Sequence, residues 1–358
     1  MQPNRSSTAP TPSRWSCWAC SAPTTSGRTQ LASAERSRYG RRWPGIRKLL
    51  WVRHRLQGQR RVAMGYREGS QKVPVGQFAR LVLLFLALVA SGFSRAADNG
   101  EFLRQLRLND FKSLEAGTRS LQRQFESGRV SETDLRDAYR QFYDLNGADL
   151  RKLDRWQDAF PKSYAVHLVR GTFYARRGAA ARGTKWASET PPENFLGMRL
   201  DNEQALAEFT ASLPLTQKPF LSVFQMMTLE GVNRPPRKEL MEFGTRMLPT
   251  NRLIRGRYIL FLTPRWGGSY EEMRAFIDYA RRTGATPKGI LELQSLMFDD
   301  MGDTAFLRGD KAAADRYFHK ALQLHEAVGG AAMGPLPFAT CYNREVTKPR
   351  ELCHKTGR

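Results

Sequence analysis

The sequence predicts an all-α fold in which antiparallel helix pairs stack as a short solenoid. From Phe102 onward, apolar residues recur at intervals of three, four and seven, which is the spacing of one helix face. No stretch alternates convincingly between apolar and polar residues, and no Asn-Gly or Asp-Gly hairpin turn appears between apolar runs. Small and aromatic residues also recur at matching offsets in successive segments, which indicates a repeat.

Residues 1–63 are predicted to be a disordered Arg- and Ser-rich segment. They hold 13 Lys and Arg residues against one acid, and their few apolar residues show no usable period. Such a segment buries too little apolar surface to offset its chain entropy. We expect it to lie upstream of a true translation start at Met64. An organelle transit peptide and a disordered cytoplasmic tail ahead of a membrane anchor remain alternatives.

Residues 64–96 have the pattern of a secretory signal peptide. Basic residues precede the apolar run Leu81–Ala90, which at ~1.5 Å per residue is too short to cross a bilayer as a helix. Small residues then favour cleavage between Ala96 and Ala97. The expected location is therefore periplasmic or secreted, with the membrane involved only through the export signal. The alternative is an uncleaved inner-membrane anchor.

The net charge of the chain does not indicate a nucleic-acid partner. The total is +23, but residues 97–358 carry only +8, with both signs interspersed. A phosphate-binding surface would concentrate its positive charge on the folded domain. We therefore expect no nucleic acid among the partners.

Residues 97–330 are predicted to form the helical-repeat domain. Leu114, Leu121 and Phe125 mark one helix face, and Gly128 ends that helix. Ser131 then begins the next helix, with Asp134 three residues later as in a capping box. Each predicted pair is too small to bury its apolar face alone, so stacking is expected.

One segment, residues 302–322, is similar to a tetratricopeptide repeat. Glycine is placed at the helix crossing and at the turn, and small and aromatic residues form the second packing face: Gly302, Gly309, Ala314, Phe318 and Ala321. A second copy is split by about twenty extra residues from Ala179 to Leu200. Its matching positions are Gly171, Tyr174, Gly178, Ala205, Phe209 and Leu213. Weaker pairs span Pro219–Leu248 and Arg252–Arg282.

Residues 331–358 are predicted to be a C-terminal tail. Cys341 and Cys353 lie in it, and either a disulfide or two free thiols fits an exported chain. Cys17 and Cys20 have no second pair at a metal-ligand spacing. The sequence thus gives no reason to expect a metal.

A candidate ligand-binding constellation lies at the turns between helices. Trp and Arg side chains suit carboxylate- or sugar-bearing ligands through ring stacking and paired hydrogen bonds. If the insert begins as a helix, Arg182 and Trp186 share a face. The alternative is that the tryptophans close helix ends and the arginines cap carbonyl groups. The candidates are Arg182, Trp186, Arg265, Trp266 and Tyr270.

Other polar residues have mainly structural interpretations. Glu271 and Glu272 follow Ser269 and are expected to complement a helix start. Asp299, Asp300 and Asp303 lack the spacing of a calcium loop, which favours a solvated turn. His167 is expected to lie in the core or between helices, and His319 and His325 fall on different helix faces.

No catalytic or cofactor-binding motif occurs in the sequence. We therefore expect no cofactor and favour a non-enzymatic scaffold that binds a protein or peptide partner. The alternative is a cell-envelope enzyme or glycan-binding module, with a groove that includes Arg265, Trp266, Glu271 and Glu272. The sequence does not indicate an oligomeric state.

Five segments together resemble the bacterial domain-of-unknown-function family 4034. They are Leu153–Trp156, Pro161–Tyr164, Arg170–Tyr174, Ala181–Lys185 and Pro264–Tyr270, the last of which includes the distinctive RWGGS element. The resemblance covers roughly residues 102–324. It implies an exported helical-repeat protein without an established activity. It gives residues 1–63 no counterpart, which supports Met64 as the start.

Overall fold

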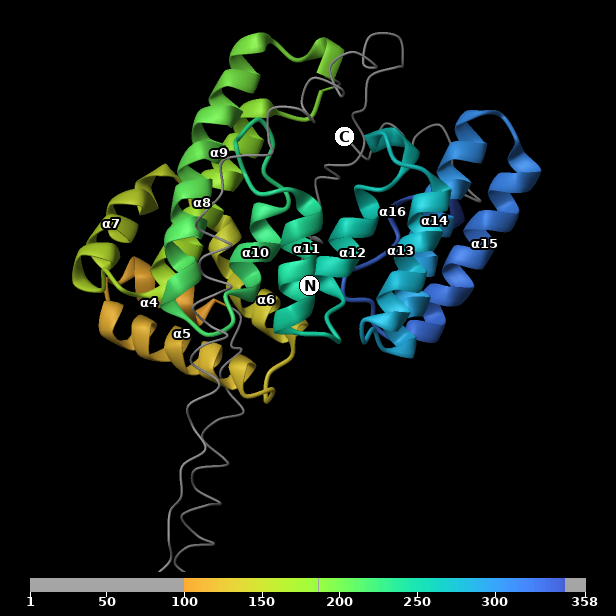
Figure 1. Ribbon diagram of the computed structural model, residues 1–358. Helices are drawn as coiled ribbons and strands as arrows, with labels where there is room; N and C mark the ends of the chain where they lie inside the picture. The colour runs from red at the N-terminus through yellow and green to blue at the C-terminus, as the bar shows by residue number, and fades with distance from the viewer. Residues whose placement is uncertain (1–99, 186, 345–358) are drawn as a thin grey trace, which may run out of the picture. The chain divides into compact units, whose positions relative to one another are not determined.

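The computed structural model describes residues 100–344 except Trp186, with side chains described as far as Thr340. Residues 105–344 belong to one compact unit and residues 100–104 to another, in which Arg104 pairs with Glu101 at 2.7 Å. The described residues form thirteen α-helices and no strand, which confirms the all-α prediction (Figure 1). The helices are α4 (Glu101–Arg107), α5 (Phe111–Glu126), α6 (Glu132–Arg140), α7 (Leu150–Ala159), α8 (Tyr164–Arg182), α9 (Pro192–Ser212), α10 (Phe220–Met226), α11 (Arg237–Met247), α12 (Leu253–Leu260), α13 (Tyr270–Arg282), α14 (Pro287–Leu307), α15 (Lys311–Val328) and α16 (Pro337–Arg344).

Two long helix pairs dominate the packing of the unit formed by residues 105–344. Helices α8 and α9 make one pair, and α14 and α15 make the other. Helices α10 to α13 lie between them in the chain, and α10 contacts α9 while α12 and α13 contact α14 (Figure 1). The predicted order of four successive helix pairs is thus present.

A glycine sits at the crossing of each long pair. A Cβ added to Gly171 would lie 2.5 Å from the ring of Phe209, and one added to Gly302 would lie 2.4 Å from the ring of Phe318. Since real Cβ atoms do not approach so closely, only glycine allows these helices to meet at this distance. The two sequence copies therefore correspond to the same kind of crossing.

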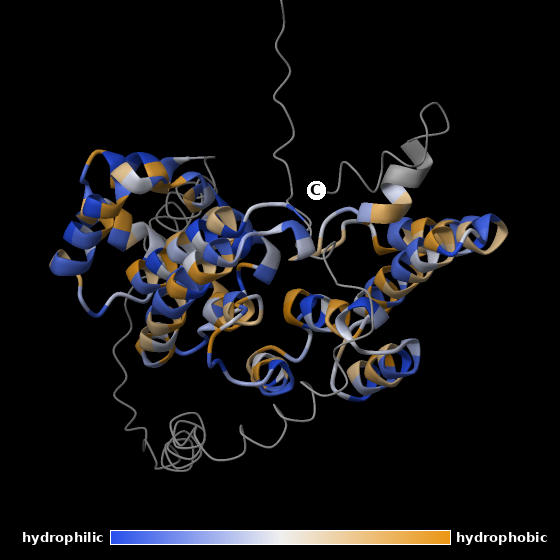
Figure 2. Cartoon of the chain, turned by 90° about the horizontal axis from the view of Figure 1, so that it is seen from above, coloured by the Kyte–Doolittle hydropathy of each residue, from blue (hydrophilic) through white to orange (hydrophobic). Residues whose placement is uncertain are grey.

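The core lies around the short helices α10 and α12, whose residues are mostly buried. Hydrophobic and hydrophilic residues alternate along the surrounding helices, as packing of one face against a core requires (Figure 2). Helix starts follow the expected chemistry: the Ser131 hydroxyl accepts a hydrogen bond from the Asp134 N–H at 3.1 Å. Gly128, just after α5, has a φ of 79°, as predicted for a helix-ending glycine.

Buried glutamates connect distant segments of this core. The Glu132 carboxylate on α6 accepts the backbone N–H of Arg252 at the start of α12. The Glu292 carboxylate on α14 accepts Nε of Arg252 at 2.7 Å and the N–H of Met333 at 2.8 Å. Burial raises the pKa of Glu132 to about 7, although the backbone N–H groups of Arg252 and Leu253 oppose the rise.

The insert in the first long pair is shorter than its sequence suggests. Helix α8 continues to Arg182, and α9 already begins at Pro192. Gly183, with a φ of 73°, ends α8. The insert therefore does not begin as a helix, which was the condition for Arg182 and Trp186 to share a face, and Trp186 lies outside the described residues.

The tail predicted from residue 331 contains a packed helix. Helix α16 contacts α14 and α15, and Ala332, Leu336 and Ala339 are buried. The expected solvated turn at Asp299, Asp300 and Asp303 is also wrong, because all three lie inside α14 and are buried.

Several predictions lie outside the described residues. These are the segment 1–63, the signal peptide 64–96 with its cleavage site between Ala96 and Ala97, the Trp186 side chain and Cys353. Cys341 lies in α16, but its side chain is not among those described. Among the described helices, none has the length and apolarity to cross a membrane.

Candidate functional site

The turn Pro264–Ser269 has a conformation that its sequence explains residue by residue. Gly267 adopts a φ of 83°, which favours glycine. A Cβ on Gly268 would lie 2.2 Å from the carbonyl oxygen of Leu262, so only glycine fits there. The Ser269 hydroxyl then accepts the N–H of Glu272 at 3.1 Å and begins α13. The RWGGS element is therefore a tight connection between α12 and α13.

The Arg265 side chain from this turn binds two buried carboxylates of α14. Its Nη2 atom lies 2.6 Å from Oδ1 of Asp300 and 2.7 Å from Oδ2 of Asp303. Its guanidinium also lies over the ring of Phe338 at 4.7 Å. These contacts join the turn to α14 and α16. They also engage the guanidinium of Arg265, which the sequence predicted to bind a ligand.

Tyr270, the first residue of α13, joins the same cluster. Its hydroxyl oxygen lies 3.0 Å from Oδ2 of Asp300 and 2.8 Å from Oγ1 of Thr304. Burial and the neighbouring Asp300 charge raise the pKa of Tyr270 well above its ordinary value. The hydroxyl is thus positioned to hold α13 on α14.

Asp299, on the same helix, binds the start of α16. Its Oδ1 atom accepts the N–H of Ala339 at 2.7 Å, and Oδ2 accepts that of Phe338 at 3.5 Å. Burial raises the pKa of Asp299 to about 8, and the charges of Asp303 and Asp300 add to the rise. Burial likewise raises the pKa of Asp300, against the opposing effect of Arg265.

Trp266 is half-buried against residues that sequence reasoning missed. It meets the Phe261 ring edge-on, with centroids 6.1 Å apart. The guanidinium of Arg237 lies 3.7 Å from the centre of the Phe261 ring and also pairs with Glu230. No local spacing relates residue 237 to residue 261, so only the packing of α11 against α12 reveals this contact.

Arg182 has a local structural role at the end of α8. Its Nη1 atom donates to the carbonyl oxygens of Gly183 and Lys185, and its guanidinium lies 5.7 Å from the centre of the Phe195 ring. Arg265 has the separate set of partners given above. Arg182 and Arg265 thus bind different elements among the described residues.

A second polar cluster links α7, α8 and α9. His167 lies between helices as expected, with Nδ1 2.6 Å from Oε2 of Glu208 and Nε2 3.3 Å from the Pro161 carbonyl oxygen. Arg170 donates to the other Glu208 oxygen at 2.6 Å and pairs with Asp154. Burial works against ionisation of Glu208, but the bonds from His167 and Arg170 outweigh it and lower the pKa of Glu208. Both ring nitrogens face acceptors within the chain.

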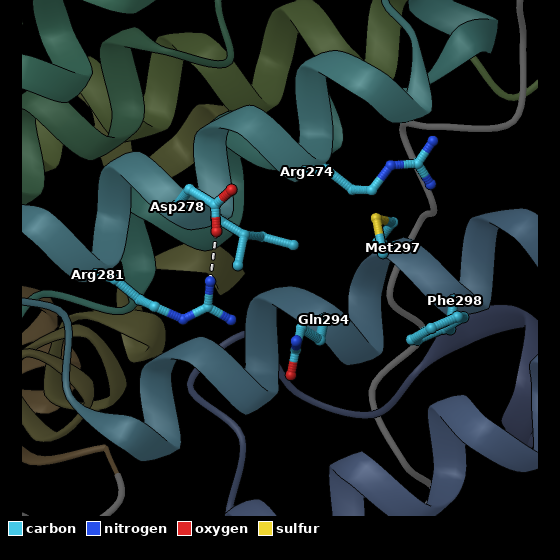
Figure 3. Close-up of a pocket in the computed structure, with 7 residues that line it drawn as sticks. Arg274, Asp278, Arg281, Gln294, Met297 and Phe298 are labelled. Carbon is cyan, nitrogen blue, oxygen red and sulfur yellow. Dashed lines mark hydrogen bonds and ion pairs between the residues drawn. The ribbon is translucent and has the colours of Figure 1, made fainter.

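A surface groove of about 210 Å³ lies between α13 and α14. Figure 3 shows Arg274, Asp278 and Arg281 extending from α13 and Gln294, Met297 and Phe298 from α14. Ile277 completes the lining, and both Ile277 and Met297 are buried. The groove has an apolar floor and a charged rim. In the described part of the chain, no group of His, Cys, Asp and Glu side chains is arranged to hold a metal ion.

Comparison with known proteins identifies the family and nothing finer. The family model described as "Domain of unknown function (DUF4034)" matches residues 106–238 and 237–281. No curated protein and no solved structure matches the chain. The matched residues run from the end of α4 to the end of α13 and include the RWGGS turn. The chain thus belongs to the DUF4034 family.

Proposed function

We propose that the protein is an exported, non-enzymatic helical-repeat scaffold that binds a protein or peptide partner. The groove between α13 and α14 is the observation that carries this proposal. Its volume, about 210 Å³, is below the ~300–1,000 Å³ typical of small-molecule sites. A hollow of this size on a helix surface suits a side chain of a docked polypeptide.

The surroundings of the RWGGS turn favour this function over a hydrolytic enzyme or glycan-binding module. A general acid needs a carboxyl group whose pKa is raised toward neutrality. Glu271 is exposed, and hydrogen bonds at the start of α13 lower its pKa. Asp299 and Asp300 do have a raised pKa, but both are buried inside the helix packing, where Asp299 binds backbone N–H groups of α16 and Asp300 binds Arg265.

Export is the second part of the proposal, and the sequence of residues 64–97 supports it. A cleavable signal peptide has three parts, and all three are present: basic residues, then a short apolar run, then small residues before Ala97. Fractionation of cells that make the full chain, with mass spectrometry of the N-terminus, tests this part. We expect a periplasmic or secreted product that begins at Ala97. A membrane-bound product that keeps Leu81–Ala90 would contradict cleavage and support the anchor.

Site-specific photo-crosslinking tests the binding function. A photoreactive amino acid replaces Gln294 in the groove or, as a matched control, the exposed Lys320 on α15. In cells that make the full chain, we expect one discrete partner adduct from position 294 and none from position 320. Identical adducts from both positions, or no adduct from the groove, would argue against partner binding there.

A further inference from the structure

The floor of the α13–α14 groove is preformed. Ile277 and Met297 are almost fully buried, so their side chains are held by the packing of the two helices. The ring of Phe298 stacks on Tyr317 of α15, with centroids 6.2 Å apart and planes 25° apart. The floor is therefore suited to one large aliphatic or aromatic side chain.

The rim places two guanidinium groups along one face of α13. Arg274 and Arg281 are seven residues apart, which corresponds to ~10 Å along a helix. Asp278 lies between them and pairs with Arg281 (Figure 3). The partner of Arg274 is Glu271, at 2.7 Å, and the two side chains are 53% and 77% exposed.

Exposed ion pairs of this kind contribute little to stability, because water screens both charges. A carboxylate brought next to an apolar contact can therefore displace Glu271 or Asp278 from its arginine at little cost. A bound peptide also shields the new pair from water, which strengthens a bidentate arginine–carboxylate contact. Residues 97–358 carry a net charge of +8, which further favours an acidic partner during encounter.

We propose that this groove binds an acidic segment of a partner protein, with one large apolar residue seated on Ile277, Met297 and Phe298 and flanking carboxylates paired with Arg274 and Arg281. This inference rests on the proposed function and adds the chemistry of the partner. The spacing of the two arginines matches carboxylates placed on both sides of the apolar residue.

Fluorescence anisotropy with the full chain and labelled twelve-residue peptides tests the proposal. The first peptide has one central Phe between glutamates, the second replaces those glutamates with lysines, and the third replaces the Phe with Ser. We expect the acidic peptide with Phe to bind at least tenfold more tightly than either of the others. Equal binding of all three peptides, or no binding of the first, would overturn the proposal.

Charge reversal in the protein provides the matched test. Both arginines are exposed, so the double variant Arg274→Glu with Arg281→Glu should keep its fold, which its unfolding midpoint checks. This variant should lose about tenfold or more affinity for the acidic peptide and gain affinity for the lysine peptide. Arg316→Glu, on the exposed surface of α15, is the control and should change neither affinity by more than about twofold.

Different results would contradict the binding function and the acidic chemistry of the partner. If the crosslink from position 294 captures a partner while the peptides show no charge preference, the acidic chemistry is wrong and the binding function stands. If position 294 captures no partner and none of the peptides binds, the binding function and the acidic chemistry are both wrong.

Discussion

The two long helix pairs have the same crossing but bury different sets of charged groups. In both, a glycine of the first helix meets a phenylalanine of the second, Gly171 with Phe209 and Gly302 with Phe318. Around α8 and α9, each of two acidic side chains meets a basic partner: Glu208 binds His167 and Arg170, and Asp201 binds Arg177. On α14, four carboxylates are buried: Glu292 pairs with Arg252, Asp300 and Asp303 share Arg265, and Asp299 binds backbone N–H groups of α16. A repeat sequence thus determines how two helices cross, while the neighbouring segments determine which charges are buried.

Removing one arginine from each region should show the largest difference. In Arg265→Met, the cation that pairs with Asp300 and Asp303 is lost, and breaking a buried pair typically costs ~3–5 kcal/mol. In Arg177→Met, the lost partner is Asp201, but the arginine side chain is 46% exposed, so we expect about 1 kcal/mol or less. Urea unfolding measures both free energies. If Arg265→Met loses as little free energy of unfolding as is expected for Arg177→Met, the α14 carboxylates do not depend on Arg265.

The shared crossing predicts similar costs for its two glycines. Gly171→Ala and Gly302→Ala each place a methyl group against a phenylalanine ring, and overpacking of this kind costs ~1–3 kcal/mol. Gly147→Ala is the control, since no atom lies within 4 Å of the added Cβ. A second change, Phe318→Leu, should recover part of the loss in Gly302→Ala but none of the loss in Gly171→Ala. A neutral Gly302→Ala would mean that the crossing is looser than described.

The two regions should respond to pH in opposite directions. Asp299 has an ordinary pKa of 3.8, raised by burial to about 8, so between these values the folded state keeps a proton that the unfolded state releases. Stability from this group therefore falls as pH rises, by at most ~1.4 kcal/mol per pH unit. The pKa of Glu208 is lowered in the folded state, so its contribution is present above its ordinary value of 4.5 and is lost as pH falls.

Unfolding curves of the variants across pH 3–9 separate these effects. Asp299→Asn should flatten the decline in stability toward neutral pH, although Glu132, with a pKa of about 7, leaves a smaller decline of the same sign. Glu208→Gln should reduce only the loss of stability that occurs at acid pH. If Asp299→Asn leaves the profile unchanged, Asp299 is not a source of the pH dependence.

The smallest expected difference in stability concerns the N-terminal ends of α9 and α15, the second helices of the two long pairs. The Asp310 carboxylate caps α15 by accepting the N–H of Ala313 at 2.9 Å, whereas α9 follows Pro191 without a side-chain cap. Asp310→Ala should cost ~1 kcal/mol and Pro191→Ala less than about 0.5 kcal/mol. Thermal unfolding of the two variants measures this. A larger effect at Pro191 would mean that its rigid turn, rather than capping, sets the start of α9.

Sequence reasoning predicted the helix pairs well because their signals are local. Ser131, Ser269 and Gly128 mark helix ends through bonds to residues within one turn. The buried state of Asp299, Asp300 and Asp303 was missed because clustered acidic residues are usually exposed to water, which favoured a solvated turn. Helix α14 instead packs against α12, α13, α15 and α16, which leaves its acidic residues no access to water. Apolar residues on every face of residues 287–307 were a signal of that enclosure.

By itself, the sequence determined the all-α class, the glycines at the two helix crossings and the turn at Gly267 and Gly268. These depend on helix periodicity and on backbone conformations that few residues adopt. Only the tertiary structure decided that Arg265 binds Asp300 and Asp303, that Arg237 covers Phe261, and that α13 and α14 leave a groove. These contacts join residues far apart in the chain, and their energies depend on burial, which local spacing does not encode.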